Sequence, residues 1–434
     1  MVRSVPAIRA DPLAFLARTC ERHGDVVAFP MPRTPVLLVN TPAAAREVLV
    51  TRATVWSKDT PQYGALGAVT GSGLLTADGE QWRTRRRMAQ PAFSHGALAP
   101  VVDQSVAAAS RLVAQVPSQG RVLDVEGALL QSTLEIVGRT LFGADVATDG
   151  ERLVRAVLEA LEVVVARVRM PLPVPGWAPT PGNRRMNRAV AELDRACAQL
   201  VARRRGAGAA GGEDLLGLLL QAVDAGLLDP RGLRDELVTM VIAGHETVAS
   251  SLAWTLGLLG QHPQHQSRLH DELDEVLGRG SDRRDPRWDD LAALPWTRAV
   301  VDEALRLYPP AWVLSRRARV ADVVAGVAVP AGTLVILSPW LLHRRADSFA
   351  SPTTFDPARF TSGARPEGYL PFGAGARQCI GRDFALVESV LVLARMLRDV
   401  RVDPDPAAAG LPATEALVTL RPRGGMPLQV TRRD

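Results

Sequence analysis

Apolar residues recur along most of the chain at the three- and four-residue spacing that places them on one face of a helix. Short runs rich in β-branched residues occur near the two ends of the chain. The clearest helical segments are 129–146, 151–170 and 183–205. The clearest strand-like runs are 26–30, 36–40, 327–338 and 417–430. This pattern predicts a mainly α-helical chain with small β-sheets.

One segment predicts a helix that crosses the whole domain. Asp229 is a favoured N-cap residue, Pro230 is tolerated at the first helical position, and the apolar pattern continues until His262. A helix of about 30 residues is about 45 Å long at 1.5 Å per residue. Apolar residues lie on nearly all its faces around 241–252, which indicates a buried core helix.

The composition is that of one large globular chain. Of 434 residues, 47% are hydrophobic and 22% are charged, which supports a large buried core. Length alone suggests two or three domains, but no composition break divides the sequence, so we predict a single domain over 1–434. The net charge of +5 is small for this length, and no basic stripe with interleaved aromatic residues indicates nucleic-acid binding.

The cysteines and the N-terminus bear on the compartment. Cys20, Cys197 and Cys379 are too widely spaced for a disulfide framework or a metal knuckle, which fits a reducing compartment. The first residues lack the apolar core of a signal peptide, and no apolar run reaches the length of about 18 residues expected of a membrane span. We expect a cytoplasmic monomer without a membrane span.

The segment FGAGARQCIG, residues 372–381, places Cys379 among three glycines and directly before a helical pattern. Glycine lets backbone approach a flat, bulky group, and a helix N-terminus lowers the pKa of a thiol. A lone cysteine is usually a small buried hydrophobe. This setting instead favours a single thiolate ligand to a metal held by a planar cofactor, with haem iron as the first candidate.

The segment AGHET lies inside the predicted core helix. Gly244 costs up to about 1 kcal/mol there relative to alanine, and the Thr247 hydroxyl can bond a backbone carbonyl and bend the helix. With Glu246 beside them, these residues predict a local opening that holds a water or a diatomic ligand. The alternative, favoured for this motif alone, is a kinked core helix. His245 has Ala249 at i+4, so a helical His metal pair is absent.

Two further motifs are charged. Glu303 and Arg306 share one helix face, and Arg359 follows in a proline-bracketed segment. Together they predict a buried carboxylate held by two guanidinium groups, although this spacing alone usually marks a surface ion pair. Trp82 and Arg86 also share a helix face and donate hydrogen bonds.

Cations near these motifs could neutralise two propionates of a planar cofactor. Arg377 stands two residues before Cys379, and either Arg316 or Arg317 follows the helix that carries Glu303. For the basic segment 82–87 the plainer alternative is a solvated helix face.

Taken together, these motifs resemble the cytochrome P-450 superfamily of haem-thiolate monooxygenases. The family's cysteine signature is met by Phe372, Gly375, Arg377, Cys379 and Gly381. Its other motifs are met in order and spacing by Trp82 and Arg86; Ala243, Gly244, Glu246 and Thr247; Glu303 and Arg306; and Pro357, Arg359 and Phe360. One departure is Val248, where many relatives carry a second Thr or Ser.

The resemblance implies a triangular-prism fold whose long central helix lies over haem b, with Cys379 as the axial iron ligand. Its implied cofactor-binding residues are Trp82, Arg86, Arg316, Phe372, Gly373, Arg377 and Gly381. Its implied catalytic residues, which bind O2 and relay protons, are Ala243, Gly244, Glu246 and Thr247. Glu303, Arg306 and Arg359 would form the family's structural knot.

The implied function is insertion of one oxygen atom of O2 into a hydrophobic small molecule such as a terpenoid, polyketide or fatty-acyl compound. Because the chain has no Rossmann glycine fingerprint and no flavin-type module, a ferredoxin and a ferredoxin reductase would supply the electrons. Alternatives are a peroxygenase, desaturation, epoxidation or coupling outcome, and a haem sensor or carrier. The expected substrate contacts are 63–74, 170–177, Ile242, Ala243, 311–314, Leu417 and Val418.

Overall fold

The computed structural model describes residues 7–433 apart from 9, 30–34, 144–149, 169–174, 176, 207 and 209–211. Helices dominate it: α2 Pro12–His23, α3 Pro42–Arg46, α4 Pro61–Thr70, α5 Gly79–Ala89, α6 Ala99–Ala114, α7 Val125–Phe142, α8 Gly150–Val168, α9 Pro181–Gly206, α10 Leu215–Asp224, α11 Pro230–Gln261, α12 Pro263–Leu277, α13 Pro295–Leu307, α14 Pro339–Leu342 and α15 Arg382–Asp399. The strands are β1 Val26–Phe29, β2 Val36–Val39, β3 Trp56–Ser57, β4 Arg121–Asp124, β5 Leu314–Ala318, β6 Asp322–Val324, β7 Val327–Val329, β8 Leu334–Leu337, β9 Val400–Pro404, β10 Thr414–Ala416, β11 Leu420–Pro422 and β12 Pro427–Arg432. The prediction of a mainly helical chain with small sheets is confirmed.

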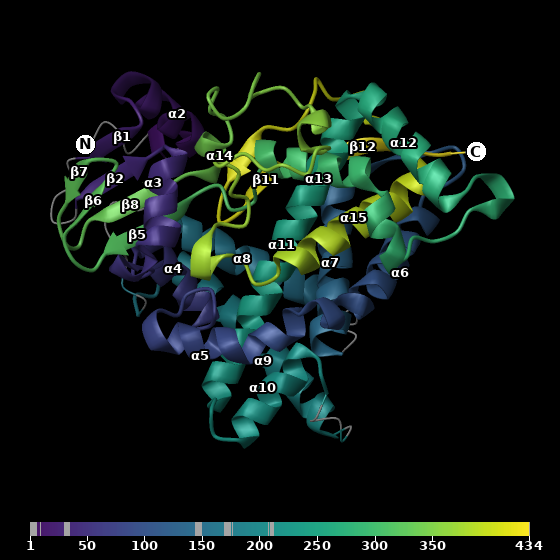
Figure 1. Cartoon of the computed structure of the whole chain (residues 1–434). Helices are drawn as coiled ribbons and strands as arrows, with labels where there is room; N and C mark the ends of the chain where they lie inside the picture. Colours follow the sequence, from purple (N-terminus) through teal and green to yellow (C-terminus); the bar gives the residue numbers. More distant parts are fainter. Residues whose placement is uncertain are drawn as a thin grey trace.

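The predicted long helix is α11, which runs through the middle of the molecule (Figure 1). The Asp229 side chain caps it by accepting a hydrogen bond from the Gly232 amide at 2.6 Å, and Pro230 occupies the first turn. Its 32 residues give a length of about 48 Å. It packs against α7, α13 and α15 and against strand β9, so the helix is buried in the core as its apolar faces predict.

The described strands form several small sheets. The largest has the order β1-β2-β8-β5-β3, in which only the β2–β8 pair is parallel, and it lies beside α2 and α3 in Figure 1. A second sheet has the order β4-β12-β9. The four predicted strand-like runs all contain strands of the structure. The hydrophobic pattern did not predict β3, β4, β5, β6, β9 and β10. Of these, β3 has only two residues and β4 is mostly exposed.

Glu388 is an unexpected carboxyl group in the helical core. It lies in the middle of α15, it is fully buried, and neither of its carboxylate oxygens has a hydrogen-bond partner among the described residues. Desolvation raises the pKa of Glu388 well above its ordinary value. A protonated, uncharged side chain therefore fits this position at neutral pH.

We expect Glu388→Gln to stabilise the protein more at pH 8 than at pH 5. At low pH the group is protonated in both the folded and the unfolded chain. As the pH rises through its unfolded pKa of about 4.3, the unfolded chain loses the proton first, which penalises the folded state. Glutamine lacks this penalty. Urea unfolding midpoints at both pH values test this, with exposed Glu275→Gln as the control, and an equal gain at both values contradicts it.

Candidate active site

The segment before α15 holds Cys379 in a turn that requires glycine. Gly373 and Gly375 have φ of +67° and +68°, and a Cβ on Gly375 would lie 2.1 Å from the Leu49 carbonyl oxygen. The Cys379 amide donates to the Phe372 carbonyl at 3.0 Å, which closes the turn. Gly381 has an ordinary φ of −87°, and a Cβ there would make ordinary van der Waals contacts with Phe93 and the Cys379 thiol. The glycine turn and this hydrogen bond therefore fix the backbone position of Cys379.

The Cys379 thiol lies in a recess. Its side chain is exposed to solvent, yet enough protein surrounds it that desolvation raises the pKa of the thiol. The Gly381 amide and the cations Arg86 and Lys58 act in the opposite direction. The amide at the helix N-terminus thus acts to lower this pKa, but loss of hydration has the larger effect and raises it overall.

A cluster of buried cations lies near this thiol. Arg377 donates to Asp78 at 2.6 Å and to the Ala77 carbonyl at 2.7 Å, while Arg316 contacts the Tyr63 hydroxyl at 3.4 Å. Burial, followed by the charges of Arg316 and Arg377, lowers the pKa of Lys58 well below its ordinary value. The charges of Asp78 and Cys379 act in the opposite direction and raise it. The cluster thus carries a surplus of positive charge, which suits a bound ligand with two carboxylates.

Strand alternation distinguishes Arg316 from Arg317. Successive residues of β5 point to opposite faces, and Arg316 is buried with 6% of its surface exposed. Arg317 instead donates to the carbonyls of Asp59 and Gly332 at the edge of the sheet. Of the two, Arg316 is therefore the one that lies with Arg377 and Lys58.

Helix α5 brings Trp82 and Arg86 against the cysteine segment. The Arg377 guanidinium lies 3.9 Å from the centre of the Trp82 ring. Arg86 donates to the Gln378 carbonyl at 2.9 Å, and burial lowers its pKa while the charge of Cys379 raises it. Two side chains four residues apart thus reach the same segment, as their helical spacing predicts.

Lys58 is a candidate functional residue that sequence reasoning missed. It follows β3, it is 8% exposed, and its ammonium donates to the Leu75 carbonyl at 2.9 Å. Its partners come from distant segments, so no local motif contains it. One signal was present in the sequence: Lys58 is the only lysine among 434 residues, in a chain whose other basic side chains are arginines and histidines.

We expect Lys58→Gln to weaken retention of a dicarboxylate cofactor. A hydrogen bond to a charged group contributes about 1.5–3 kcal/mol, so haem should leave the variant at least about tenfold faster. Transfer of haem to apomyoglobin measures that rate. Lys58→Arg should retain most of the affinity, and Arg317→Gln, on the other face of β5, is the matched control. Equal haem loss from Lys58→Gln and from the unchanged protein contradicts the assignment.

Three residues in the central part of α11 are only half-buried, whereas their neighbours along the helix are buried. From Asp235 to Gly260, every residue is buried except Ala243, Gly244 and Thr247. Their spacing places them on one side of the helix. Helix α11 also packs against α15, whose N-terminus follows Cys379.

The predicted opening of α11 is absent, because the helix runs unbroken from Pro230 to Gln261. The Thr247 hydroxyl donates to the Ala243 carbonyl at 2.7 Å, as in the alternative interpretation of a satisfied core threonine. Gly244 is explained by close packing, since a Cβ there would lie 2.9 Å from the side chain of Val137 on α7. His245 bonds the Val241 carbonyl, and burial lowers its pKa to about 4.

Glu246 does not lie beside the Thr247 hydroxyl. Its carboxylate accepts a hydrogen bond of 2.6 Å from Thr419 in the turn between β10 and β11. It is 3% exposed, and desolvation raises its pKa while Thr419 and Arg421 act to lower it. The acid and the alcohol of the AGHET segment therefore face different neighbours in this structure.

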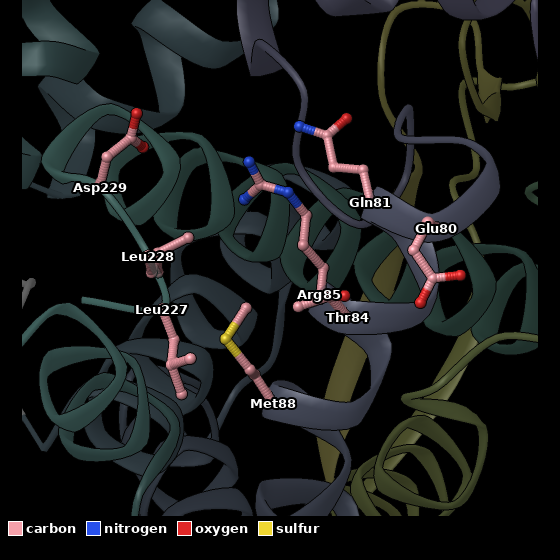
Figure 2. A pocket seen from close by; sticks show the side chains of 8 residues that line it. All are labelled: Glu80, Gln81, Thr84, Arg85, Met88, Leu227, Leu228 and Asp229. Carbon is pink, nitrogen blue, oxygen red and sulfur yellow. The ribbon is translucent and has the colours of Figure 1, made fainter. Parts of the chain in front are cut away.

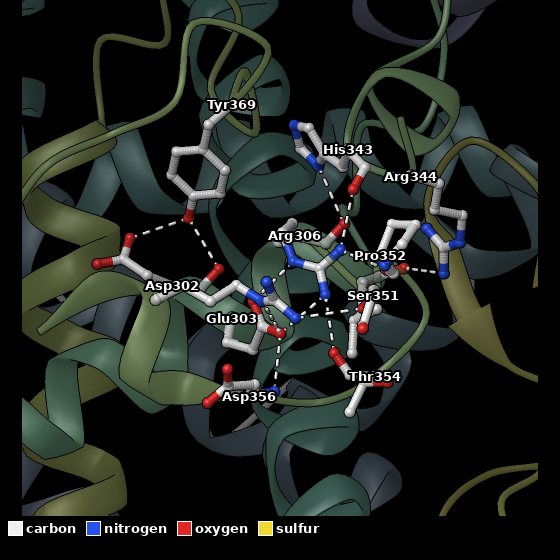
Figure 3. Close-up of polar contacts among 12 residues, drawn as sticks. Asp302, Glu303, Arg306, His343, Arg344, Ser351, Pro352, Thr354, Asp356 and Tyr369 are labelled. Carbon is white, nitrogen blue, oxygen red and sulfur yellow. Dashed lines mark hydrogen bonds and ion pairs between the residues drawn. The ribbon is translucent and has the colours of Figure 1, made fainter. Parts of the chain in front are cut away.

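Figure 3 shows the predicted carboxylate knot in place. The Arg306 guanidinium makes two hydrogen bonds of 2.7 Å with Glu303, and Arg359 contacts the same carboxylate at 3.1 Å. Glu303 and Arg306 are fully buried, so the pair is shielded from water. Arg306 also donates to three carbonyls, those of His343, Pro352 and Thr354. The knot thus joins α13 to the loop that precedes the cysteine segment.

The structure describes only some of the residues expected to contact substrate. The loop predicted at 63–74 is wrong in its first half, because Thr60 caps α4 and Pro61 starts it. Ala311, Leu314, Leu417 and Val418 are half-buried and apolar. Residues 170–174 and 176 lie outside the described part of the chain, and Trp177 is 84% exposed.

A surface pocket of about 390 Å³ lies between α5 and the turn before α11 (Figure 2). It contains none of the predicted site residues. Its lining residues are Glu80, Gln81, Thr84, Arg85, Met88, Leu227, Leu228 and Asp229. Arg85 points from α5 towards α11, where it pairs with Glu236 at 2.9 Å. The pocket therefore marks a helix junction and is separate from the recess at Cys379.

A recessed thiol, a buried cation cluster and a long central helix define the class of thiolate-ligated haem proteins. The family model for cytochrome P450 matches residues 4–428. The chain is 36% identical over 411 residues to cyclooctat-9-en-7-ol 5-monooxygenase of Streptomyces melanosporofaciens, covering 92% of this chain and 87% of that protein. It is 33% identical over 416 residues to pentalenene oxygenase of Streptomyces avermitilis, covering 94% and 90%. The chain belongs to the cytochrome P450 family, and it is a monooxygenase.

Solved structures agree with this assignment. The crystal structure of CYP175A1 from Thermus thermophilus matches with a TM-score of 0.80 at 30% identity, covering 98% of this chain and 96% of that one. A six-coordinated cytochrome P450 from another strain of Thermus thermophilus matches with a TM-score of 0.76 at 30% identity, covering 97% and 99%. The predicted P450 fold is thus confirmed. No helix in the described part of the chain is long and apolar enough to cross a membrane.

Proposed function

We propose that Cys379 is the axial ligand of haem b and that the enzyme inserts one atom of O2 into a hydrophobic terpenoid. The observation that carries the proposal is the recessed thiol beside a buried surplus of cations. Among the described residues no group of three or more His, Cys, Asp or Glu side chains could hold a metal, which fits a site with one protein ligand. Haem combines an iron that accepts a thiolate with two carboxylates that such cations would neutralise.

The residues of the chain have distinct tasks in this proposal. Bound haem would supply the oxygen chemistry, and the protein would position the substrate and the haem and transfer protons. The Gly381 amide and Arg86 stabilise the Cys379 thiolate. Lys58, Arg316 and Arg377 hold the carboxylates, with Trp82 supporting Arg377. On α11, the small residues Ala243 and Gly244 leave space for a ligand. The Thr247 hydroxyl, which donates to the Ala243 carbonyl in this structure, would hold a proton or a water.

The terpenoid substrate class is supported by two observations. The half-buried residues at the expected substrate contacts of 311–314 and 417–418 are apolar. Relatives are named for reactions on cyclooctat-9-en-7-ol and pentalenene. A panel of cyclic terpenes, fatty acids and charged metabolites tests this class by displacement of the iron-bound water, read in the visible spectrum. Shifts caused only by the charged compounds would contradict it.

Electrons come from a separate ferredoxin and its reductase in this proposal. Arg83 and Arg87 on α5 and Arg382 at the start of α15 are exposed on elements that flank Cys379. Such cations suit an acidic partner. The cytoplasmic location, the monomeric state and the single domain stay predictions.

Turnover with a separate acidic ferredoxin should fall as ionic strength rises. Salt shortens the screening length from about 10 Å at 0.1 M to about 3 Å at 1 M, which weakens attraction between exposed charges. We expect Arg87→Glu to lower the rate at low salt and to weaken its salt dependence. The rate with peroxide in place of ferredoxin is the control and should not follow salt. A ferredoxin-driven rate that ignores salt argues against a charged docking surface.

A peroxide-driven reaction is the second candidate. A relay that activates dioxygen would need Glu246 and Thr247 to act together, whereas the Glu246 carboxylate bonds Thr419 instead. Rates with hydrogen peroxide and with ferredoxin at equal substrate concentration distinguish the two. A haem sensor or carrier would show no substrate-dependent consumption of reductant.

A further inference from the structure

One face of α11 is bonded to the hairpin formed by β10 and β11. Glu246, Ser250 and Trp254 are four residues apart, so they lie along one side of the helix. Thr419 donates to Glu246 at 2.6 Å, while Ser250 and Trp254 both donate to the Leu420 carbonyl, at 2.7 and 3.1 Å. The acid of the AGHET segment is thus part of the attachment between the helix and this hairpin.

The same turn presents the apolar residues expected to contact substrate. Leu417 and Val418 are half-buried, and Val418 directly precedes Thr419. The Trp312 indole donates to the Leu417 carbonyl at 3.0 Å, which holds the other end of the turn. A ligand that displaces Val418 therefore has to move Thr419, because one peptide unit joins them.

The Glu246 carboxyl is sensitive to small movements of that turn. It is fully desolvated, and its second oxygen has no hydrogen-bond partner among the described residues. The charged groups that face it are Arg421 on β11, itself paired with Glu415 at 2.9 Å, and Glu126 on α7. Burial raises the pKa of Glu126 to about 8, so Glu126 is a second group that could cause a pH dependence. Within the described part of the chain, the Thr419 hydroxyl is the one side-chain group that donates directly to the carboxylate of Glu246.

We propose that Thr419 is a positioning residue that links substrate contact at Leu417 and Val418 to the proton affinity of Glu246. The inference rests on the proposed function for the identity of the substrate-contacting turn. A hydroxyl donates more strongly to a carboxylate than to a neutral acid, so moving Thr419 away favours the protonated form. Linkage is reciprocal, so the affinity for substrate must then depend on the protonation state of Glu246.

The experiment measures the Kd of one neutral cyclic terpene hydrocarbon from pH 5 to 9 by calorimetry on the haem-loaded protein. A neutral hydrocarbon has no titration of its own. We expect about a fivefold change in Kd, the lower end of usual coupling between sites. Thr419→Val keeps the shape and removes the hydroxyl, so it should flatten the dependence, as should Glu246→Gln. Thr419→Ser should restore it, and Thr414→Val on the same hairpin is the control.

Two results would overturn the proposal: a pH dependence that Thr419→Val leaves intact, and a dependence that Glu126→Gln abolishes and Glu246→Gln does not. A second measurement needs no substrate. The infrared band of the protonated Glu246 carboxyl, identified by its loss in Glu246→Gln, should shift in Thr419→Val and not in Thr419→Ser. An unshifted band also overturns the proposal. Failure of every terpene to bind counts against the proposed substrate class alone, because the infrared test still decides the role of Thr419.

Discussion

Replacing Cys379 by alanine should abolish the red-shifted Soret band that reduced, thiolate-ligated haem gives with carbon monoxide. Cys379 is the only cysteine in the recess, since Cys197 is buried in α9 and Cys20 lies in α2. No other described side-chain cluster could replace it as a metal site. Substrate oxidation supported by reductant should fall to the background rate, because the Cys379 thiolate would hold the haem iron and support its oxygen chemistry.

Cys197→Ala is the matched control for this result. The same chemical change is made in a residue with 8% exposure whose pKa burial raises to about 12. The control should keep the red-shifted band and lose only about 1 kcal/mol of stability, because a small side chain leaves a small cavity. A Cys379→Ala protein that keeps the red-shifted band would refute thiolate ligation by this residue. If the Cys197→Ala protein also loses the red-shifted band, the loss of the band reports disturbed folding and not loss of the thiolate ligand.

The elements that the sequence predicts well are those with long periodic patterns. For α11 an N-cap residue, a proline in the first turn and an unbroken apolar pattern agree, and the helix follows them. Turns closed by local motifs, such as the glycine turn at Cys379, were also predictable because a few adjacent residues determine them. The raised pKa of the Cys379 thiol was not predictable from the local sequence, because the fold as a whole desolvates the thiol.

Two residues show what sequence patterns leave out. Lys58 and Thr419 belong to no motif, and the role of each follows from partners in other segments of the chain. Thr419 is 173 positions from Glu246, so nothing local relates the two side chains. The same reason explains the wrong expectation for AGHET. Spacing places Glu246 and Thr247 side by side in the sequence, while packing against the hairpin and the recess turns them towards different neighbours.

Replacing Arg306 by lysine should destabilise the fold by about 3–5 kcal/mol, the usual cost of breaking a buried ion pair. Its planar guanidinium reaches both oxygens of Glu303 and three carbonyls at once, which one ammonium group cannot do. The unpaired buried groups would loosen the loop that leads to the cysteine segment. We therefore expect haem content to fall together with the urea midpoint.

The control for Arg306 lies on the same helix. Arg298 forms an ion pair with Asp302 at 2.9 Å, but its side chain is 38% exposed, so Arg298→Lys should cost less than about 1 kcal/mol. Arg359→Gln, whose partner Glu303 keeps its bonds to Arg306, should lie between the two. Urea unfolding followed by circular dichroism gives the three values. If Arg306→Lys and Arg298→Lys lower the free energy of unfolding equally, burial of the knot does not stabilise the fold. Where Arg306→Lys folds poorly, the order of the three unfolding free energies still decides the question.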